Sequence, residues 1–358
     1  MLYKILYDLH ESFSPFNVFR YITFRSAMAA VTAAMVTIIF APMIIRRLKK
    51  LSVKCLREDT PKRHRDEKGD IPTMGGLIII LSIFTAVLAW GDLTNQYVLL
   101  MLFALAGFGG IGFADDLMKV RGRGGMRART KFGLQIIMAL SIGLFLKANP
   151  VDEHATMLIM PFFKRMFIDL AIFYIPFAIL VIVGSSNAVN LTDGMDGLAI
   201  GLVGIATLAN GALVYISGHR GLAEYLNVLY LPYTAELTVF CGAMFGAALG
   251  FLWYNAYPAE VFMGDVGSLG LGGSLGTLAV ISKHEIVLAV VGGIFVIETL
   301  SVVLQVASFK LTGKRIFLMA PIHHHFELKG WPEPRIIVRF WIAGIVLALL
   351  SLATLKVR

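Results

Sequence analysis

Long apolar runs without a charged side chain recur along the whole chain. A transmembrane helix needs about 20 apolar residues, so each run predicts one membrane span. Two runs are short, and Glu298 interrupts the ninth. We therefore expect an all-α integral membrane protein with about ten transmembrane helices, organised as one polytopic domain over residues 1–358. The ten runs cover residues 26–45, 71–91, 93–114, 132–146, 170–192, 197–218, 237–259, 266–282, 286–309 and 340–355.

Composition supports a membrane protein over a soluble one. Hydrophobic residues make up 57% of the 358 positions and charged residues only 15%, whereas soluble domains have about 25% charged residues. The first apolar run begins near Ser26 without a small-residue cleavage site after it, which favours a retained span over a signal peptide. Two cysteines, Cys55 and Cys241, are too few for a disulfide framework.

The net charge of +9 is explained by membrane topology more economically than by nucleic-acid binding. If the first span runs from outside to inside, 22 of the 32 Lys and Arg residues fall in the inner segments. Cytoplasmic loops of membrane proteins carry such an excess. The pattern predicts that both termini lie outside and that the basic loops lie in the cytoplasm.

Two of the predicted inner loops, Ser185–Asp196 and Tyr254–Asp265, contain no Lys or Arg and are rich in Asn, Asp and Gly. These loops lack the charge that sets topology, so we expect a chemical constraint on them instead. Carboxylates next to a bilayer are costly. The acidic groups at the predicted cytoplasmic helix ends are therefore candidates for function.

The first acidic group is Asp115–Asp116, followed by Lys119 at a spacing that reaches either carboxylate along a helix. An ion pair at a helix end is one interpretation. The other is a Mg²⁺ site, because Mg²⁺ prefers a few carboxylates together with water and substrate phosphate oxygens.

The second group repeats every three residues, at Asn187, Asn190, Asp193 and Asp196. A helix would place the four on one stripe, but the two glycines that follow Asp193 and Asp196 favour a turn between the fifth and sixth spans. An Asx-rich turn that caps the sixth helix is the alternative.

The third group is Asp265, which is flanked by glycines that allow close backbone approach. An N-cap of the eighth helix is the simpler interpretation here, and it is compatible with metal binding.

A run of three histidines, His323, His324 and His325, lies in the last inner loop. Consecutive side chains point in different directions, and the spacing lacks a zinc signature. Contact with an anion, or proton transfer, suits these imidazoles better, and packing of one of them is expected.

Taken together, the motifs resemble the phospho-N-acetylmuramoyl-pentapeptide-transferase family, within the bacterial polyprenyl-phosphate N-acetylhexosamine-1-phosphate transferase superfamily. The resemblance covers essentially the whole chain. It rests on five ordered motifs: Pro72–Gly76, Asp115–Asp116 with Lys119, Asn187–Gly197, Phe262–Ser268 and Pro321–Pro334.

The resemblance implies a Mg²⁺-dependent reaction of peptidoglycan synthesis. UDP-N-acetylmuramoyl-pentapeptide and undecaprenyl phosphate would give UMP and the lipid-linked sugar diphosphate, lipid I. It also implies a multi-pass protein of the bacterial inner membrane, a homodimer, with periplasmic termini and an active-site cleft on the cytoplasmic face.

The resemblance further implies roles for individual residues. Asp265 would be the principal Mg²⁺ ligand with Asp115 and Asp116 close by, and Asp115 would deprotonate or orient the lipid phosphate. Phe262 would stack on uracil, unless it is a core or lipid-facing side chain. The other expected catalytic residues are Lys119, His323, His324 and His325. The expected substrate-binding residues are Lys68, Thr73, Lys131, Asn187, Asn190, Leu191, Asp193, Gly194, Asp196, Phe262, Ser268 and Gln305.

Three alternatives remain open from the sequence. A phospho-aspartate at Asp265 or Asp115 would replace direct attack by the lipid phosphate. A related transferase that uses UDP-N-acetylglucosamine would share the chemistry. A secondary transporter would place its binding groups near the midplane, often with an internal repeat, whereas here most acidic groups lie at one face and no repeat is clear.

Overall fold

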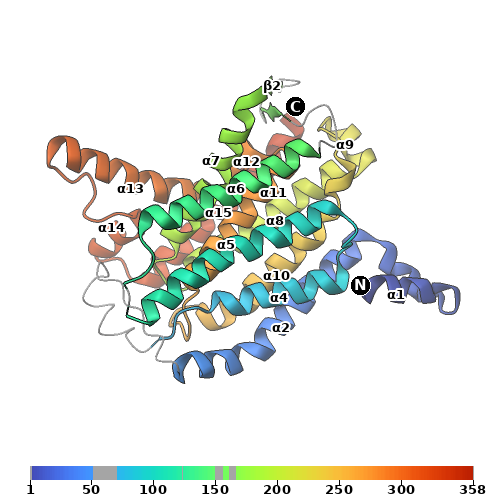
Figure 1. The fold of residues 1–358 in the computed structure, drawn as a ribbon, viewed down its shortest axis with the longest axis horizontal. Coiled ribbons are helices and arrows are strands. Elements are labelled where there is room, and N and C mark those ends of the chain that lie inside the picture. The colour runs from blue at the N-terminus through green and yellow to red at the C-terminus, as the bar shows by residue number, and fades with distance from the viewer. Residues whose placement is uncertain (1, 51–70, 123, 150–155, 161–166, 358) are drawn as a thin grey trace.

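The computed structural model describes residues 2–122, 124–149, 156–160 and 167–357, except for 51–70. Cys55 and the predicted substrate-binding residue Lys68 lie outside the described residues. Apart from one small antiparallel hairpin, the regular structure described is helical (Figure 1). The hairpin pairs β1 (Met157–Ile159) with β2 (Phe167–Asp169). The helices are α1 (Leu2–Asp8), η1 (Leu9–Glu11), η2 (Ser14–Arg20), α2 (Ile22–Lys50), α4 (Gly76–Trp90), α5 (Gln96–Val120), α6 (Ala128–Ala148), η3 (Ala171–Phe173), α7 (Tyr174–Thr192), α8 (Leu198–Gly218), α9 (Arg220–Leu226), η4 (Pro232–Thr234), α10 (Leu237–Asn255), α11 (Gly264–Ser282), α12 (Glu285–Val291), α13 (Gly293–Thr312), α14 (Ile322–Leu328) and α15 (Glu333–Val357).

The prediction of an all-α integral membrane protein is confirmed. Within the described residues, nine helices are long and apolar enough to cross a membrane, and α4 is a shorter apolar helix. Each predicted span has its helix, with one correction. The ninth run is not one helix, because it breaks at Gly292 into α12 and α13. Consecutive glycines at 292 and 293 remove side-chain support from the backbone there, which permits the break.

Helix α11 forms the centre of the bundle. Every residue from Asp265 to Ser282 is buried, and the helix packs against α5 and α7. Glycines make these contacts close. A Cβ atom on Gly76 of α4 would lie 2.1 Å from the backbone nitrogen of Gly267. Small residues at such crossings bring two backbones together, as is common in membrane bundles.

Close glycine contacts also join α2 and α10. Gly242, Gly246 and Gly250 lie four residues apart on one face of α10, against the backbone of α2. A Cβ atom on Gly246 would lie 1.9 Å from the carbonyl oxygen of Ala30. The spacing is the small-xxx-small pattern of membrane helix pairs.

In Figure 1, α13 projects away from the rest of the bundle, and α14 lies beneath it. Both marked chain ends lie on the side of the molecule away from α14. Only the first half of α13 contributes buried side chains, namely Ile294, Phe295, Glu298 and Ser301. The remainder of α13 is therefore held by few tertiary contacts.

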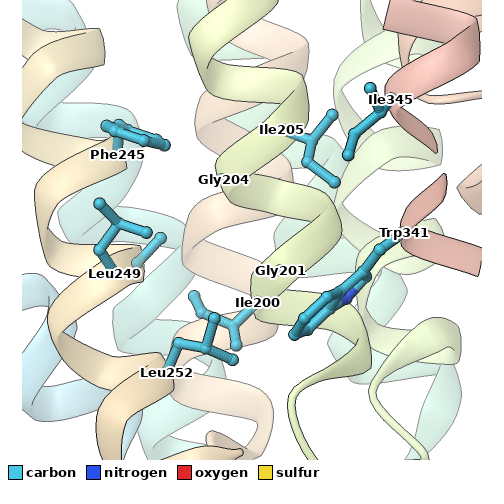
Figure 2. Close-up of a pocket in the computed structure, with 10 residues that line it drawn as sticks. Ile200, Gly201, Gly204, Ile205, Phe245, Leu249, Leu252, Trp341 and Ile345 are labelled. Atoms are coloured by element: carbon cyan, nitrogen blue, oxygen red, sulfur yellow. The ribbon is translucent and has the colours of Figure 1, made fainter. Parts of the chain in front are cut away.

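An apolar pocket lies between α8, α10 and α15 (Figure 2). Its cavity volume is about 200 Å³, and the Trp341 ring lies beside Gly201 on one wall. Leu249 and Leu252 of α10 form the opposite wall. None of the predicted site residues lines this pocket, so it is separate from the chemistry that the sequence predicts.

Candidate active site

Three carboxylates from two helices meet at one end of the bundle. Asp115 and Asp116 lie in the second-last turn of α5, and Asp265 lies in the first turn of α11. Each residue is at most 3% exposed, and one carboxylate oxygen from each lies within 4.8 Å of the others. The helices approach closely here because residue 112 is a glycine, whose Cβ would lie 2.0 Å from the carbonyl oxygen of Asp265.

Two lysines fill the space between these carboxylates. The ammonium nitrogen of Lys119 lies 2.8 Å from Asp115, 3.3 Å from Asp116 and 2.7 Å from Asp265. Lys131 of α6 reaches Asp115 at 3.2 Å and also pairs with Asp265. Lys119 thus pairs with carboxylates of both α5 and α11. The alternative interpretation, an ion pair within one helix end, does not account for the contact with α11. Buried charges require such pairing.

Backbone amides hold two of the carboxylates in place. The N–H of Met126 donates to Asp115 at 2.6 Å, and the N–H of Val266 donates to Asp116 at 3.2 Å. The second donor belongs to the first turn of α11, where amides lack intrahelical partners and attract negative charge. The amides therefore fix the orientation of these two carboxylates.

Gly264 has a backbone that only glycine adopts easily here. Its φ is +71°, and a Cβ would lie 2.6 Å from Asp116 Oδ2 and 2.8 Å from Thr73 Oγ1. The predicted close approach beside Asp265 is thus confirmed. The N-cap interpretation is wrong, because Met263 occupies the cap position and Asp265 lies inside the first turn.

Thr73 reaches the cluster because its segment pairs with the loop before α11. The N–H of Phe262 donates to the Pro72 carbonyl, and the N–H of Gly75 donates to the Phe262 carbonyl, both at 2.9 Å. This pairing brings the second and eighth spans together at the site. The Phe262 side chain is partly buried, and its stacking on uracil stays a prediction.

The amide side chains of α7 face the same region. Asn190 accepts a hydrogen bond from Ser268 at 3.1 Å, and Asn187 pairs with Gln135 at 2.9 Å. Helix α7 continues to Thr192. The two asparagines are therefore helical, and the predicted turn begins only after Thr192. Gln135, fully buried in α6, was missed because a lone glutamine in an apolar run carries no motif.

Asp196 joins the turn after α7 to two other segments. Its Oδ2 accepts from the N–H of Ala259 at 3.0 Å, and its own N–H donates to Glu333 at 2.9 Å. The turn residue Gly197 donates to Asn255 at 3.0 Å. The predicted side-chain cap of α8 is wrong, because Gly197 holds the cap position without a side-chain bond. The sequence also does not reveal the structural contributions of Asn255 and Glu333, because each depends on a partner far away in the chain.

Asp193 and Asp196 do not join the carboxylate cluster. Among the described residues, the carboxylates close enough to share one ion are Asp115, Asp116 and Asp265. Leu191 is partly buried at the end of α7. The proposed contacts of Leu191, Asp193 and Asp196 with substrate stay predictions.

The consecutive histidines each have a different partner. His323 Nδ1 lies 3.1 Å from Glu298 of α13, and His324 Nδ1 lies 2.9 Å from Glu327 within α14. The two side chains thus point to different partners, as expected for consecutive residues. The imidazole of His323 thus gives Glu298 the polar neighbour that a carboxylate inside a span needs.

His325 has a structural contact. Its Nδ1 accepts a hydrogen bond from the N–H of Leu318 at 3.1 Å, so a neutral ring carries its proton on Nε2. Burial, and then the charge of Lys329, lower the pKa of His325 and favour the neutral form. This bond matches the expectation that one of the three histidines would serve in packing.

The side chain of Gln305 forms hydrogen bonds with the backbone of the segment before α14. Its Oε1 accepts from the N–H groups of Ile316 and Phe317, and its Nε2 donates to the Phe317 carbonyl at 2.9 Å. Gln305 therefore orders the loop that leads to the histidines. Direct contact of Gln305 with substrate stays a prediction.

Comparison with known proteins agrees with this geometry. The family model of glycosyl transferase family 4 matches residues 98–283, which include all three clustered carboxylates and both lysines. A protein of Thermodesulfovibrio yellowstonii, named phospho-N-acetylmuramoyl-pentapeptide-transferase, is 63% identical over 362 aligned residues. Proteins of Desulfosudis oleivorans and Citrifermentans bemidjiense with the same name are each 53% identical. Each alignment covers 100% of both chains.

The chain belongs to the phospho-N-acetylmuramoyl-pentapeptide-transferase family. Membership in this transferase family confirms the resemblance drawn from the five motifs. Four of those motifs supply residues to the connected region around the carboxylate cluster: Thr73, Asp115, Asn190 and Asp265. The histidine motif reaches the turn at Gly194, where a Cβ would lie 2.4 Å from His323 Nε2.

Proposed function

We propose that this chain transfers phospho-N-acetylmuramoyl-pentapeptide from its UDP-linked precursor to undecaprenyl phosphate. An oxygen of the lipid phosphate attacks the sugar-linked phosphorus, the bond to the other phosphate breaks, and UMP leaves. The observation that carries the proposal is identity over the full length to transferases of that name, 63% in one relative. The buried cluster of acids and lysines suits this chemistry, because phosphoryl transfer depends mainly on positioning and electrostatics.

We propose Asp115, Asp116 and Asp265 as the Mg²⁺ ligands. The donor set fits, because the three offer hard oxygen atoms within 4.8 Å of one another, and Mg²⁺ binds to carboxylates and substrate phosphates. When bound, the ion supplies charge neutralisation for the diphosphate and for the departing UMP. The amides of Met126 and Val266 keep two of the ligands oriented.

Lys119 and Lys131 have a second task in this proposal. Both ammonium groups contact the carboxylates and retain partial exposure, 20% and 16% of their side chains. They are thus placed to turn toward the phosphate oxygens when substrates arrive. Preorganised cations reduce the repulsion between two anionic reactants. Asp115, which is bound to both lysines, remains the proposed group that orients or deprotonates the lipid phosphate.

The nucleotide sugar is proposed to lie along the polar ends of α7 and α11. Asn187, Asn190 and Ser268 present amide and hydroxyl groups there. The turn at Asp193–Asp196 and the ring of Phe262 complete the proposed contacts. Thr73 Oγ1 and Asp116 Oδ2 both lie beside Gly264, so the proposed substrate contacts begin next to the proposed metal ligands.

The proposed setting is the bacterial inner membrane, with the site on the cytoplasmic face, and the proposed assembly is a homodimer. The inner-loop excess of Lys and Arg supports this orientation. The loops of the site contain no Lys or Arg, so the other, basic inner loops would set the membrane topology.

The decisive assay uses the full chain, purified in detergent, with UDP-N-acetylmuramoyl-pentapeptide and undecaprenyl phosphate. We expect release of UMP together with one equivalent of lipid product. Release stops with EDTA and returns with Mg²⁺. Asp265→Asn should reduce turnover at least 100-fold, because a ligand charge is lost at the transition state.

Three outcomes would count against the proposal or one of its parts. Equal UMP release from UDP-N-acetylglucosamine would move the chain to the related transferases. Near-normal turnover of Asp265→Asn in saturating Mg²⁺ would refute the ligand assignment. A phosphoenzyme trapped in a single turnover without lipid acceptor would instead replace direct attack by a covalent route.

A further inference from the structure

A fully buried Glu–His pair connects α13 to α14. Glu298 and His323 are both 0% exposed, and Glu298 Oε1 lies 3.1 Å from His323 Nδ1. The two residues are 25 positions apart in sequence, so the pair is a tertiary contact. In a span, a carboxylate costs several kcal/mol unless it has a partner, and His323 supplies one.

The carboxylate oxygens and ring nitrogens of this pair are buried without well-formed hydrogen bonds in the part of the chain that the structure describes. Within the described residues, neither oxygen of Glu298 and neither ring nitrogen of His323 makes a well-formed hydrogen bond. The 3.1 Å contact is therefore a close approach whose angle is poor for a hydrogen bond. Four such buried atoms are costly, which argues that this arrangement serves more than stability.

The opposite edge of the His323 ring lies against the turn after α7. A Cβ on Gly194 would lie 2.4 Å from Nε2 and 3.0 Å from Cε1 of His323. The ring thus occupies the space that a side chain at 194 would need. Contacts run from Glu298 through His323 to the turn that carries Asp193 and Asp196.

Among the described residues, the Glu298–His323 pair is one of the few buried contacts that hold α13 against the rest of the molecule. Its buried side chains are Ile294, Phe295, Glu298 and Ser301, all in the first half of the helix. Of these, Glu298 alone carries an ionisable side chain, and its carboxylate reaches α14. This carboxylate, together with the packing of α14 on α15, therefore helps to set the position of the ring that contacts Gly194.

We propose that Glu298 is a positioning residue that acts through His323. It holds the imidazole against Gly194 and thereby fixes the turn at Asp193–Asp196 in the shape that receives the nucleotide sugar. This inference rests on the proposed function for its choice of substrate. The pairing and its effect on the turn depend only on the contacts described.

The kinetic test compares Glu298→Gln with Ser301→Ala in the full chain. Ser301 is buried one turn further along α13, and its hydroxyl donates a hydrogen bond to the Glu298 carbonyl, so its variant is a matched control. We expect Glu298→Gln to raise KM for the nucleotide sugar about tenfold, within the range of coupling between contacting residues. KM for undecaprenyl phosphate and both constants of the control should change less than about twofold.

A double-mutant cycle tests whether the effect passes through the histidine. With His323→Asn as background, adding Glu298→Gln should leave KM for the nucleotide sugar unchanged, because the positioned ring is absent. Additive losses in the cycle would overturn the proposal. So would an unchanged KM in folded Glu298→Gln, or an equal rise for both substrates. Glu298→Asp, whose shorter side chain withdraws from the ring, should shift KM in the same direction.

Histidine NMR provides a readout that needs no substrate. In protein labelled with ¹⁵N-histidine, the ring signals absent from His323→Asn belong to His323, and Glu298→Gln should shift them. Ring signals that are identical in wild type and Glu298→Gln would refute the pairing. If the wild type releases no UMP from the muramoyl nucleotide, the proposed function fails, and this NMR comparison still decides the pairing.

Discussion

At the scale of single residues, the charge balance of the buried cluster is the most informative feature. Three carboxylates face two ammonium groups within a few ångströms. The lysines therefore compensate the acids in the structure described, and a divalent ion must compete with them electrostatically. At an effective dielectric of about 20, unit charges 4 Å apart interact by about 4 kcal/mol, so we expect each lysine to influence the affinity of the proposed metal site strongly.

The first prediction concerns Lys131. Lys131→Met should strengthen Mn²⁺ binding several-fold, because a competing cation is removed from the carboxylates, while UMP release falls at least 100-fold. A Mn²⁺ titration followed by EPR measures the affinity without turnover. Lys147→Met, an exposed change at the far end of α6, serves as the control. Weaker Mn²⁺ binding in Lys131→Met would contradict the competition argument.

The second prediction concerns Gly264. Alanine there must adopt φ of +71° and place Cβ 2.6 Å from Asp116 Oδ2. The left-handed backbone alone costs about 1–2 kcal/mol, and the clash displaces a proposed ligand. Gly264→Ala should lower both the thermal midpoint and Mn²⁺ affinity. Gly110→Ala on α5 has no atom within 4 Å of its Cβ and should change neither.

Residues differ in how well the sequence reveals them. Asp115, Asp116 and Asp265 could be predicted because charge beside apolar spans is conspicuous and costly. Gln135, Asn255 and Glu333 could not, because each is an ordinary polar residue whose role depends on a distant partner. Pairings such as Gln135 with Asn187 and Glu333 with Asp196 form only when the helices pack.

At the scale of helices, the apolar runs predict the spans well, because each helix must satisfy its own backbone hydrogen bonds in lipid. The break between α12 and α13 was missed because glycine is common in membrane helices and no charge marks Gly292. Hydropathy also does not reveal which helix is central. The burial of α11 follows from glycines such as Gly267 meeting Gly76.

The third prediction belongs to the α2–α10 crossing. Gly246→Ala places a Cβ 1.9 Å from the Ala30 carbonyl oxygen, so the helices must separate and lose van der Waals contact. We expect a lower thermal midpoint, with UMP release per folded molecule within about twofold of wild type. Gly184→Ala, whose Cβ has no neighbour within 4 Å, is the matched control. An unchanged midpoint for Gly246→Ala would show that this contact contributes little to stability.

At the scale of the whole molecule, the arrangement concentrates chemistry at one end. The C-terminal ends of α5 and α7 and the first turns of α11 and α15 supply Asp116, Asn190, Asp265 and Glu333. Such sharing among helices distant in sequence requires that alternate loops lie on the same side. The excess of Lys and Arg in the inner loops supports the proposal that this side is cytoplasmic, where soluble nucleotide sugars are accessible.

The fourth prediction tests this orientation directly. Single cysteines are introduced by Arg121→Cys, after the acidic end of α5, and by Arg220→Cys, at the start of α9, in a chain whose Cys55 and Cys241 are replaced by Ser. Arg121 and Arg220 are both exposed and lie at opposite ends of the spans. A membrane-impermeant maleimide applied to intact cells whose outer membrane is permeabilised should label position 220 and not 121. Disruption of the inner membrane should then expose position 121. The reverse pattern would place the carboxylate cluster outside, away from cytoplasmic nucleotides, and would exclude the proposed reaction in its cellular setting even if purified protein released UMP.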